Sequence, residues 1–177
     1  MGMLLESPQF NAAWSTTLKL LTGGTLGLLL AIMLLSVFRD SPLFSLDGFL
    51  GIALPFAIIM GTAAFSVRGY SIEDGQIRIH RLGWSTTYPV DTVHHAEVVP
   101  GIMKGSIRTW GNGGLFGFIG HFQNDRLGAY RAYATNATDI VHLRIDGESI
   151  VITPNRPGEF VGRLKQDAAW EPNVVPS

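Results

Sequence analysis

The chain of 177 residues contains no cysteine. This absence excludes disulfides, zinc–thiolate sites and thiol catalysis. Charge is also scarce, because only 15% of the residues are charged, and 13 basic and 14 acidic side chains give a formal net charge of −1 at pH 7. A protein that binds nucleic acid through its phosphates needs a basic excess, so the composition predicts that nucleic acid is not a partner.

Apolar residues are abundant, and two uncharged apolar runs occupy most of the first 70 positions. The first run, residues 20–38, contains eight leucines; a short loop, 39–47, separates it from the second run, 48–67. Runs of this length span about 30 Å as helices, the thickness of the bilayer core. We therefore predict a transmembrane hairpin preceded by an N-terminal segment, 1–19. Two alternatives stay open: a cleaved signal peptide, although a basic n-region and a small-residue cleavage site are lacking, and a buried hairpin of a soluble protein.

Small residues recur at four-residue spacing in both runs, which is typical of closely packed membrane helices. These helix-packing candidates are Gly23 and Gly27 in the first run and Ala53, Ala57 and Gly61 in the second. They either close the hairpin on itself or form a homodimer. Glycine and alanine are also simply frequent in membrane helices.

The basic residues near the apolar runs predict the orientation in the membrane. Lys19 precedes the first run, and Arg68, Arg78 and Arg81 follow the second, whereas the loop carries only Arg39. Basic residues favour the cytoplasmic side. We expect a multi-pass protein of the cytoplasmic membrane, with both termini and the larger C-terminal part in the cytoplasm.

The part beyond the hairpin predicts one domain built mainly of β-strands. Two Asp-Gly pairs, at 74–75 and 146–147, each separate alternating apolar segments, which is typical of hairpin turns. Further strands are expected at 85–88, 94–99 and 127–134, giving about seven antiparallel strands. Residues 157–167 predict a short amphipathic helix capped by Asn155, with Phe160, Val161 and Leu164 on one face. The tail, 168–177, is expected to fray.

The stretch 108–122, Arg-Thr-Trp-Gly-Asn-Gly-Gly-Leu-Phe-Gly-Phe-Ile-Gly-His-Phe, followed by 127–136, Leu-Gly-Ala-Tyr-Arg-Ala-Tyr-Ala-Thr-Asn, resembles the signature of bacterial PH-like domains. Members of this largely uncharacterised family often follow two membrane helices. The resemblance covers about 68–165 and implies a PH-like barrel over 68–167, formed by two packed sheets with the C-terminal α-helix plugging one open end. It transfers no catalytic or ligand residues.

The glycine-rich stretch itself matches neither a P-loop nor a dinucleotide fingerprint. One interpretation is that its glycines permit tight turns while its apolar side chains fill the barrel. The other is that residues 115–119 form an apolar tip at the headgroup region of the membrane, surrounded by basic residues. The second interpretation makes these residues a candidate membrane- or partner-binding loop: Lys104, Arg108, Trp110, Leu115, Phe116, Phe118, Arg126 and Arg131.

The five histidines lack the spacing of a metal motif. Adjacent His94 and His95 are expected on opposite faces of a strand. We therefore expect no metal and no cofactor, although a site composed of several strands stays open. No nucleophile elbow is present, so catalysis is not expected.

Two functions follow from these observations. The first is a membrane-anchored, non-enzymatic adaptor or regulatory module that binds a protein partner or lipid headgroups at the cytoplasmic face of the bilayer. The alternative is a small membrane enzyme or transporter accessory subunit that uses the histidines or the glycine-rich loop.

Overall fold

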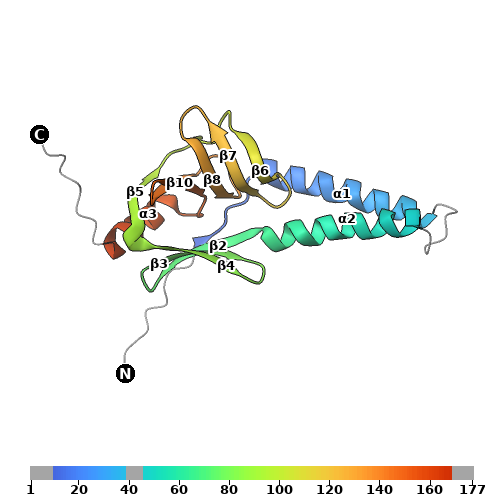
Figure 1. The fold of residues 1–177 in the computed structure, drawn as a ribbon, viewed down its shortest axis with the longest axis horizontal. Coiled ribbons are helices and arrows are strands. Elements are labelled where there is room, and N and C mark those ends of the chain that lie inside the picture. Colours follow the sequence, from blue (N-terminus) through green and yellow to red (C-terminus); the bar gives the residue numbers. More distant parts are fainter. Residues whose placement is uncertain (1–9, 39–45, 169–177) are drawn as a thin grey trace, which may run out of the picture.

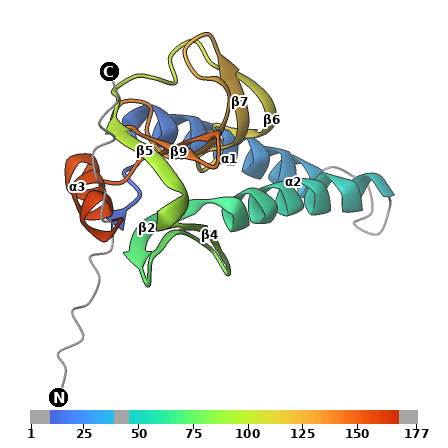
Figure 2. The same ribbon diagram turned by 60° about the vertical axis from the view of Figure 1, so that its left-hand side comes forward.

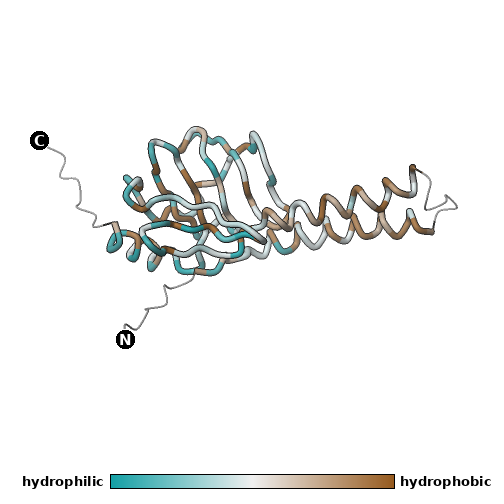
Figure 3. Tube along the Cα trace, turned by 60° about the horizontal axis from the view of Figure 1, so that its bottom comes forward, coloured by the Kyte–Doolittle hydropathy of each residue, from teal (hydrophilic) through white to brown (hydrophobic). Residues whose placement is uncertain are grey.

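A computed structural model of the chain describes residues 10–38 and 46–168, and it combines a helical hairpin with a two-sheet β domain (Figure 1). Helix α1 (Thr16–Phe38) and helix α2 (Leu46–Phe65) lie side by side and extend away from the domain. Both are long and apolar enough to cross a membrane. Most residues of both helices are hydrophobic, whereas hydrophobic and hydrophilic residues alternate in the domain (Figure 3), and many apolar side chains of the helices are exposed.

The smaller sheet has four strands in the order β1-β2-β3-β4, all antiparallel. Strands β2 (Val67–Glu73) and β3 (Gln76–Arg81) form the first predicted hairpin, and Asp74 and Gly75 adopt the positive φ angles that its tight turn requires. Strand β4 is Ser85–Pro89, and a 3-10 turn, Val90–Thr92, follows it. Strand β1 (Phe10–Asn11) comes from the segment before the helical hairpin and pairs with β2.

The larger sheet has six strands in the order β5-β9-β10-β8-β7-β6. Strands β9 (Val141–Ile145) and β10 (Glu148–Ile152) form the second predicted hairpin around Asp146-Gly147. The remaining strands are β5 (Val93–Val98), β6 (Ile107–Gly113), β7 (Phe118–Asn124) and β8 (Gly128–Ala134).

The predicted barrel of about seven antiparallel strands needs three corrections. The described residues form ten strands, and β6 and β7 lie within the glycine-rich stretch where no strand was expected. Strands β8 and β10 pair in parallel, because β10 inserts between β8 and β9 in the sheet. No ladder joins β4 to β5 or β1 to β6 in the described residues, so the two sheets pack face to face without closing into a barrel; a single bridge joins Ala12 to Pro154.

The core lies between the sheets and is closed at one end by helix α3 (Pro157–Asp167). Phe160, Val161 and Leu164 are buried on one face of α3, as its spacing predicted. The predicted cap at Asn155 was wrong: the N-cap is Arg156, and the backbone N–H of Asn155 donates to the carbonyl of Asn11. Helix α3 and the helical hairpin lie at opposite ends of the domain (Figures 1 and 2).

One side chain connects the two sheets through its hydroxyl group. Tyr70, on β2, is fully buried, and its hydroxyl donates to the backbone carbonyl of Tyr133 at 2.6 Å. The same oxygen accepts the backbone N–H of Thr153 at 3.2 Å. Because Tyr133 belongs to β8 and Thr153 follows β10, this hydroxyl fixes the spacing between the sheets.

Candidate functional site

The glycine-rich segment packs directly onto the helical hairpin. The hydroxyl of Thr22 on α1 donates to the carbonyl of Gly114 at 3.3 Å and accepts the backbone N–H of Phe116 at 3.1 Å. The Phe116 ring packs edge-to-face on Trp14, just before α1. Leu115 is only 9% exposed. The loop predicted as an apolar tip is therefore held against the first turns of α1.

Two glycines explain why β6 and β7 pair although their sequence lacks the usual pattern of a strand. Gly111 on β6 lies directly opposite Gly120 on β7, and both have positive φ angles of +106° and +134°. A Cβ atom on either would collide with the backbone of the other strand. The side chains that ordinarily mark a strand are absent here because the two backbones approach too closely to admit them.

Trp110, next to Gly111, is 77% exposed. Unlike the buried Ile119 on β7, it does not fill the core, and it lines a cleft between β6 and the C-terminal half of α2. This α2–β6 cleft has a volume of about 430 Å³. Its lining is mostly apolar and consists of Ala57, Ile58, Gly61, Thr62, Phe65, Trp110, Gly111, Asn112 and Ile119.

Two arginines contact residues at or next to the lining of this cleft without lining it themselves, and the sequence prediction identified only one of them. The guanidinium of Arg81, at the end of β3, stacks 6.0 Å from the ring of Phe65, 5.7 Å from that of Trp84 and 5.1 Å from that of Tyr133. Stacking on three rings holds a cation without neutralising it.

Arg131, on β8, is the arginine that the sequence prediction included. It lies 3.2 Å from Nε2 of His121, whose backbone is paired with that of Trp110. The pKa of Arg131 is raised, chiefly by its hydrogen bond to the Tyr88 hydroxyl. In the described part of the chain neither Arg81 nor Arg131 forms an ion pair with an acidic side chain. The site therefore combines an apolar cleft with two unneutralised cations.

The remaining predicted binding residues lie elsewhere. Lys104 and Arg126 are exposed near the β7–β8 turn, at the end of β7 that lies away from α1. At this turn, the side-chain amide of Asn124 donates a hydrogen bond to the carbonyl of Ile102. Arg108 and Phe118 line a second cavity of about 350 Å³ on the opposite face of the larger sheet. The four predicted basic residues thus do not form one patch.

The three predicted helix-packing glycines do not contact the neighbouring helix. A Cβ atom added at Gly23, Gly27 or Gly61 would meet nothing within 4 Å beyond the helix's own backbone, and the close contact between α1 and α2 joins Gly51 to Ser36 instead. Ala57 lines the α2–β6 cleft, and Ala53 lies on α2 one turn before it.

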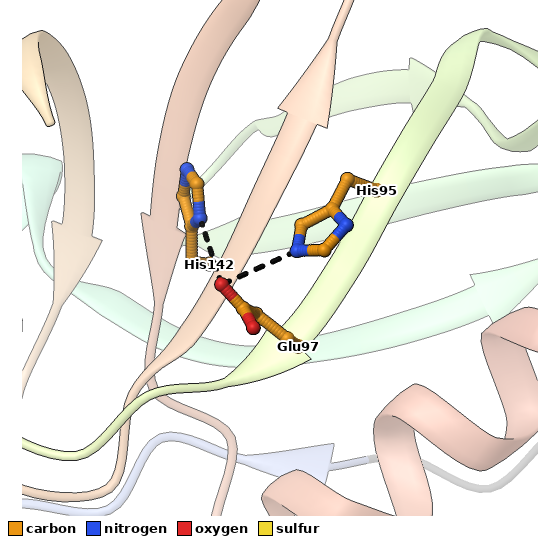
Figure 4. Close-up of side chains that lie close together, drawn as sticks. All are labelled: His95, Glu97 and His142. Atoms are coloured by element: carbon orange, nitrogen blue, oxygen red, sulfur yellow. Dashed lines mark ion pairs between the residues drawn. The ribbon is translucent and has the colours of Figure 1, made fainter. Parts of the chain in front are cut away.

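A second group of side chains was not recognised as a group in the sequence. His95 and Glu97 on β5 and His142 on β9 bring their nitrogen and oxygen atoms within 4.8 Å of one another (Figure 4). Their proximity depends on the register of β5 against β9, which places Glu97 opposite His142. The spacing of residues in the sequence does not predict which residues of two strands pair. It predicts only that His95 and Glu97 lie on the same face of their strand.

Two packed β-sheets and a C-terminal helix make this a mainly β domain with the elements of a PH-like domain, although the sheets do not close into a barrel. The family model described as Bacterial PH domain matches residues 68–168, and the chain belongs to that family. Comparison with curated proteins and comparison with solved structures found no match. PH-like domains are typically non-enzymatic binding modules, and this class agrees with the binding role predicted from the sequence.

Proposed function

We propose that this protein is a membrane-anchored binding module in which the α2–β6 cleft holds an anionic phospholipid at the cytoplasmic face of the bilayer. Helices α1 and α2 form the anchor, and the cleft lies beside the last turns of α2. The observation that carries the proposal is the pairing of an apolar cleft with Arg81 and Arg131. The apolar lining suits an acyl chain, and the two guanidinium groups, which both lie near Tyr133, suit a phosphate.

The aromatic residues around the cleft support this placement. Trp84 and Trp110 are partly or largely exposed, and Phe65 ends α2. Tryptophan is enriched at the level of lipid headgroups, where its ring meets both apolar and polar surroundings. The same level suits the two arginines, because anionic lipids attract basic groups by about 1 kcal/mol for each residue near the surface.

Native mass spectrometry of the full chain in detergent tests the proposal, with phosphatidylglycerol and phosphatidylcholine added separately. We expect retention of phosphatidylglycerol in preference to phosphatidylcholine. The double variant Arg81→Gln/Arg131→Gln should weaken that retention about 10- to 30-fold, as the loss of two such attractions predicts. The control is Arg163→Gln, since Arg163 lies on α3 and pairs with Asp167. Equal retention of both lipids, or equal loss in the control, contradicts the proposal.

A second candidate function rests on the free edge of β6. In the described residues β6 pairs with β7 alone, and its side chains are largely exposed, Ile107 by 73%. An exposed edge strand can accept an extended peptide from a partner protein. A photoreactive residue in place of Trp110 separates the two candidates in cells: crosslinks to lipid support the first, and one protein crosslink of defined mass supports the second.

A further inference from the structure

The side chains of His95, Glu97 and His142 project from the outer face of the six-stranded sheet. The inner face of β5 carries the buried Val93 and Ala96 instead. Because His95 and Glu97 are two positions apart on one strand, both point to the same side. Glu97 is paired in register with His142 on β9, so three side chains from two neighbouring strands converge on one point (Figure 4).

Two of the three distances between their polar atoms are close to those between the ligands of a single metal ion. Oε1 of Glu97 lies 3.2 Å from Nε2 of His95 and 3.7 Å from Nδ1 of His142. An ion bound tetrahedrally at 2.0–2.2 Å from each ligand holds those ligands about 3.3–3.6 Å apart. The third pair, the two histidine nitrogens, lies within 4.8 Å, so a small rotation of the exposed His95 ring completes the geometry.

His142 is held in the orientation of a metal ligand. Its Nε2 lies 3.2 Å from Oγ of Ser149 on β10, and its Nδ1 is buried without a hydrogen-bond partner. In the tautomer that donates Nε2–H to Ser149, the lone pair on Nδ1 faces Glu97. An outer hydrogen bond of this kind fixes the ring and the tautomer of metal-binding histidines. Burial lowers the pKa of His142, which favours the neutral form that binds metals.

We propose that His95, Glu97 and His142 bind a divalent transition-metal ion, with Zn²⁺ the best match to two imidazoles and one carboxylate. Three protein ligands leave at least one coordination position open to water or to a donor from another molecule. Arg144 is a cation on the same face, opposite His95 in register, so it opposes binding of the ion. The site shares no residue with the α2–β6 cleft, so the metal proposal does not depend on the lipid proposal.

Zn²⁺ titration by calorimetry tests the site on the full chain, purified in detergent with a tag that contains no histidine and stripped with a chelator. We expect one equivalent to bind. His142→Gln and Glu97→Gln should each weaken binding at least about tenfold, and Ser149→Ala about tenfold through the ring orientation. His94→Gln is the matched control, because His94 is exposed on the same strand and lies outside the cluster.

Two further measurements keep the test decisive. His95→Asn alters a half-exposed side chain, so it should remove Zn²⁺ binding without lowering the melting temperature, even where His142→Gln disturbs folding. Absorption spectra of the protein loaded with Co²⁺ should show nitrogen and oxygen ligands around the ion in the wild type. In each variant, the spectra should show the loss of one ligand. Absence of stoichiometric Zn²⁺ binding overturns the proposal. It is also overturned if the variants of His95, Glu97 and His142 bind Zn²⁺ as tightly as the His94 control.

Discussion

Replacing Tyr70 with phenylalanine should remove one buried hydrogen-bonded connection between the two sheets. The substitution keeps the ring packed against Phe160 but deletes the hydroxyl that bonds to the carbonyl of Tyr133 and the N–H of Thr153. Each buried group left without a partner costs about 1–3 kcal/mol. With two such groups, we expect Tyr70→Phe to lower the free energy of unfolding by about 2–6 kcal/mol, a large share of the stability of a small domain.

The same hydroxyl predicts a loss of stability at alkaline pH. Burial raises the pKa of Tyr70 from 10.0 to about 12 in the folded protein. The unfolded chain ionises this tyrosine first, so the contribution is fully present below pH 10 and is lost as the pH rises towards 12. A difference of two pH units corresponds to about 2.7 kcal/mol. Tyr70→Phe should lack this part of the alkaline destabilisation.

Urea unfolding of the full chain in detergent, followed by tryptophan fluorescence at pH 8 and between pH 10 and 12, measures both effects. The pKa values of Tyr130 and Tyr133 are also raised, but both residues remain in the variant, so the difference isolates Tyr70. At pH 8, Tyr88→Phe is the control, because its hydroxyl is only partly buried and bonds to the Tyr133 hydroxyl. The reasoning is refuted if Tyr70→Phe unfolds at the wild-type urea concentration, or if both proteins lose stability in parallel above pH 10.

Two other predictions concern the glycine pair and the orientation of the chain. Gly120→Ala places a Cβ against the Gly111 backbone at a φ of +134°, so it should destabilise the domain by at least about 2 kcal/mol in the same urea assay. The control is Gly162→Ala on α3, which has open space around it and should stabilise the domain by about 0.5–1 kcal/mol. Equal effects of the two substitutions would contradict the close approach of β6 and β7. Because the chain has no cysteine, the single variants Ser41→Cys and Lys165→Cys each carry one thiol whose side of the membrane can be measured. A membrane-impermeant thiol reagent added to intact cells should label only Ser41→Cys. Labelling of Lys165→Cys alone would reverse the predicted orientation.

The sequence predicted those parts of the fold that local chemistry determines. The Asp74-Gly75 and Asp146-Gly147 turns have the positive φ angles that their residues favour, and both flanking hairpins are confirmed. The helix predicted at 157–167 is confirmed with the same bounds. Strands β6 and β7 were missed because their pairing depends on the contact between Gly111 and Gly120, and glycine ordinarily weakens a strand.

Long-range packing determines the parts that the sequence did not predict. Closure into a barrel depends on ladders between distant strands, and the parallel pairing of β8 with β10 has no local signal. Arg131 was identified beside the glycine-rich stretch, but Arg81 reaches the cleft only because β3 ends near Phe65 of α2. Glu97 was not singled out, because its position beside two histidines depends on the register of β5 against β9.

The helical hairpin has almost no free chain at its junctions with the β domain. Ser66 alone separates α2 from β2, and the segment before α1 is fixed where the backbone N–H of Ser15 donates to the carbonyl of Thr135. Two such attachments prevent the domain from swivelling on its anchor. In the proposed membrane setting, a change in helix tilt therefore turns the whole domain as one body. In that setting, the proposal implies that bilayer thickness, by changing the helix tilt, also changes the distance of the cleft from the lipid surface.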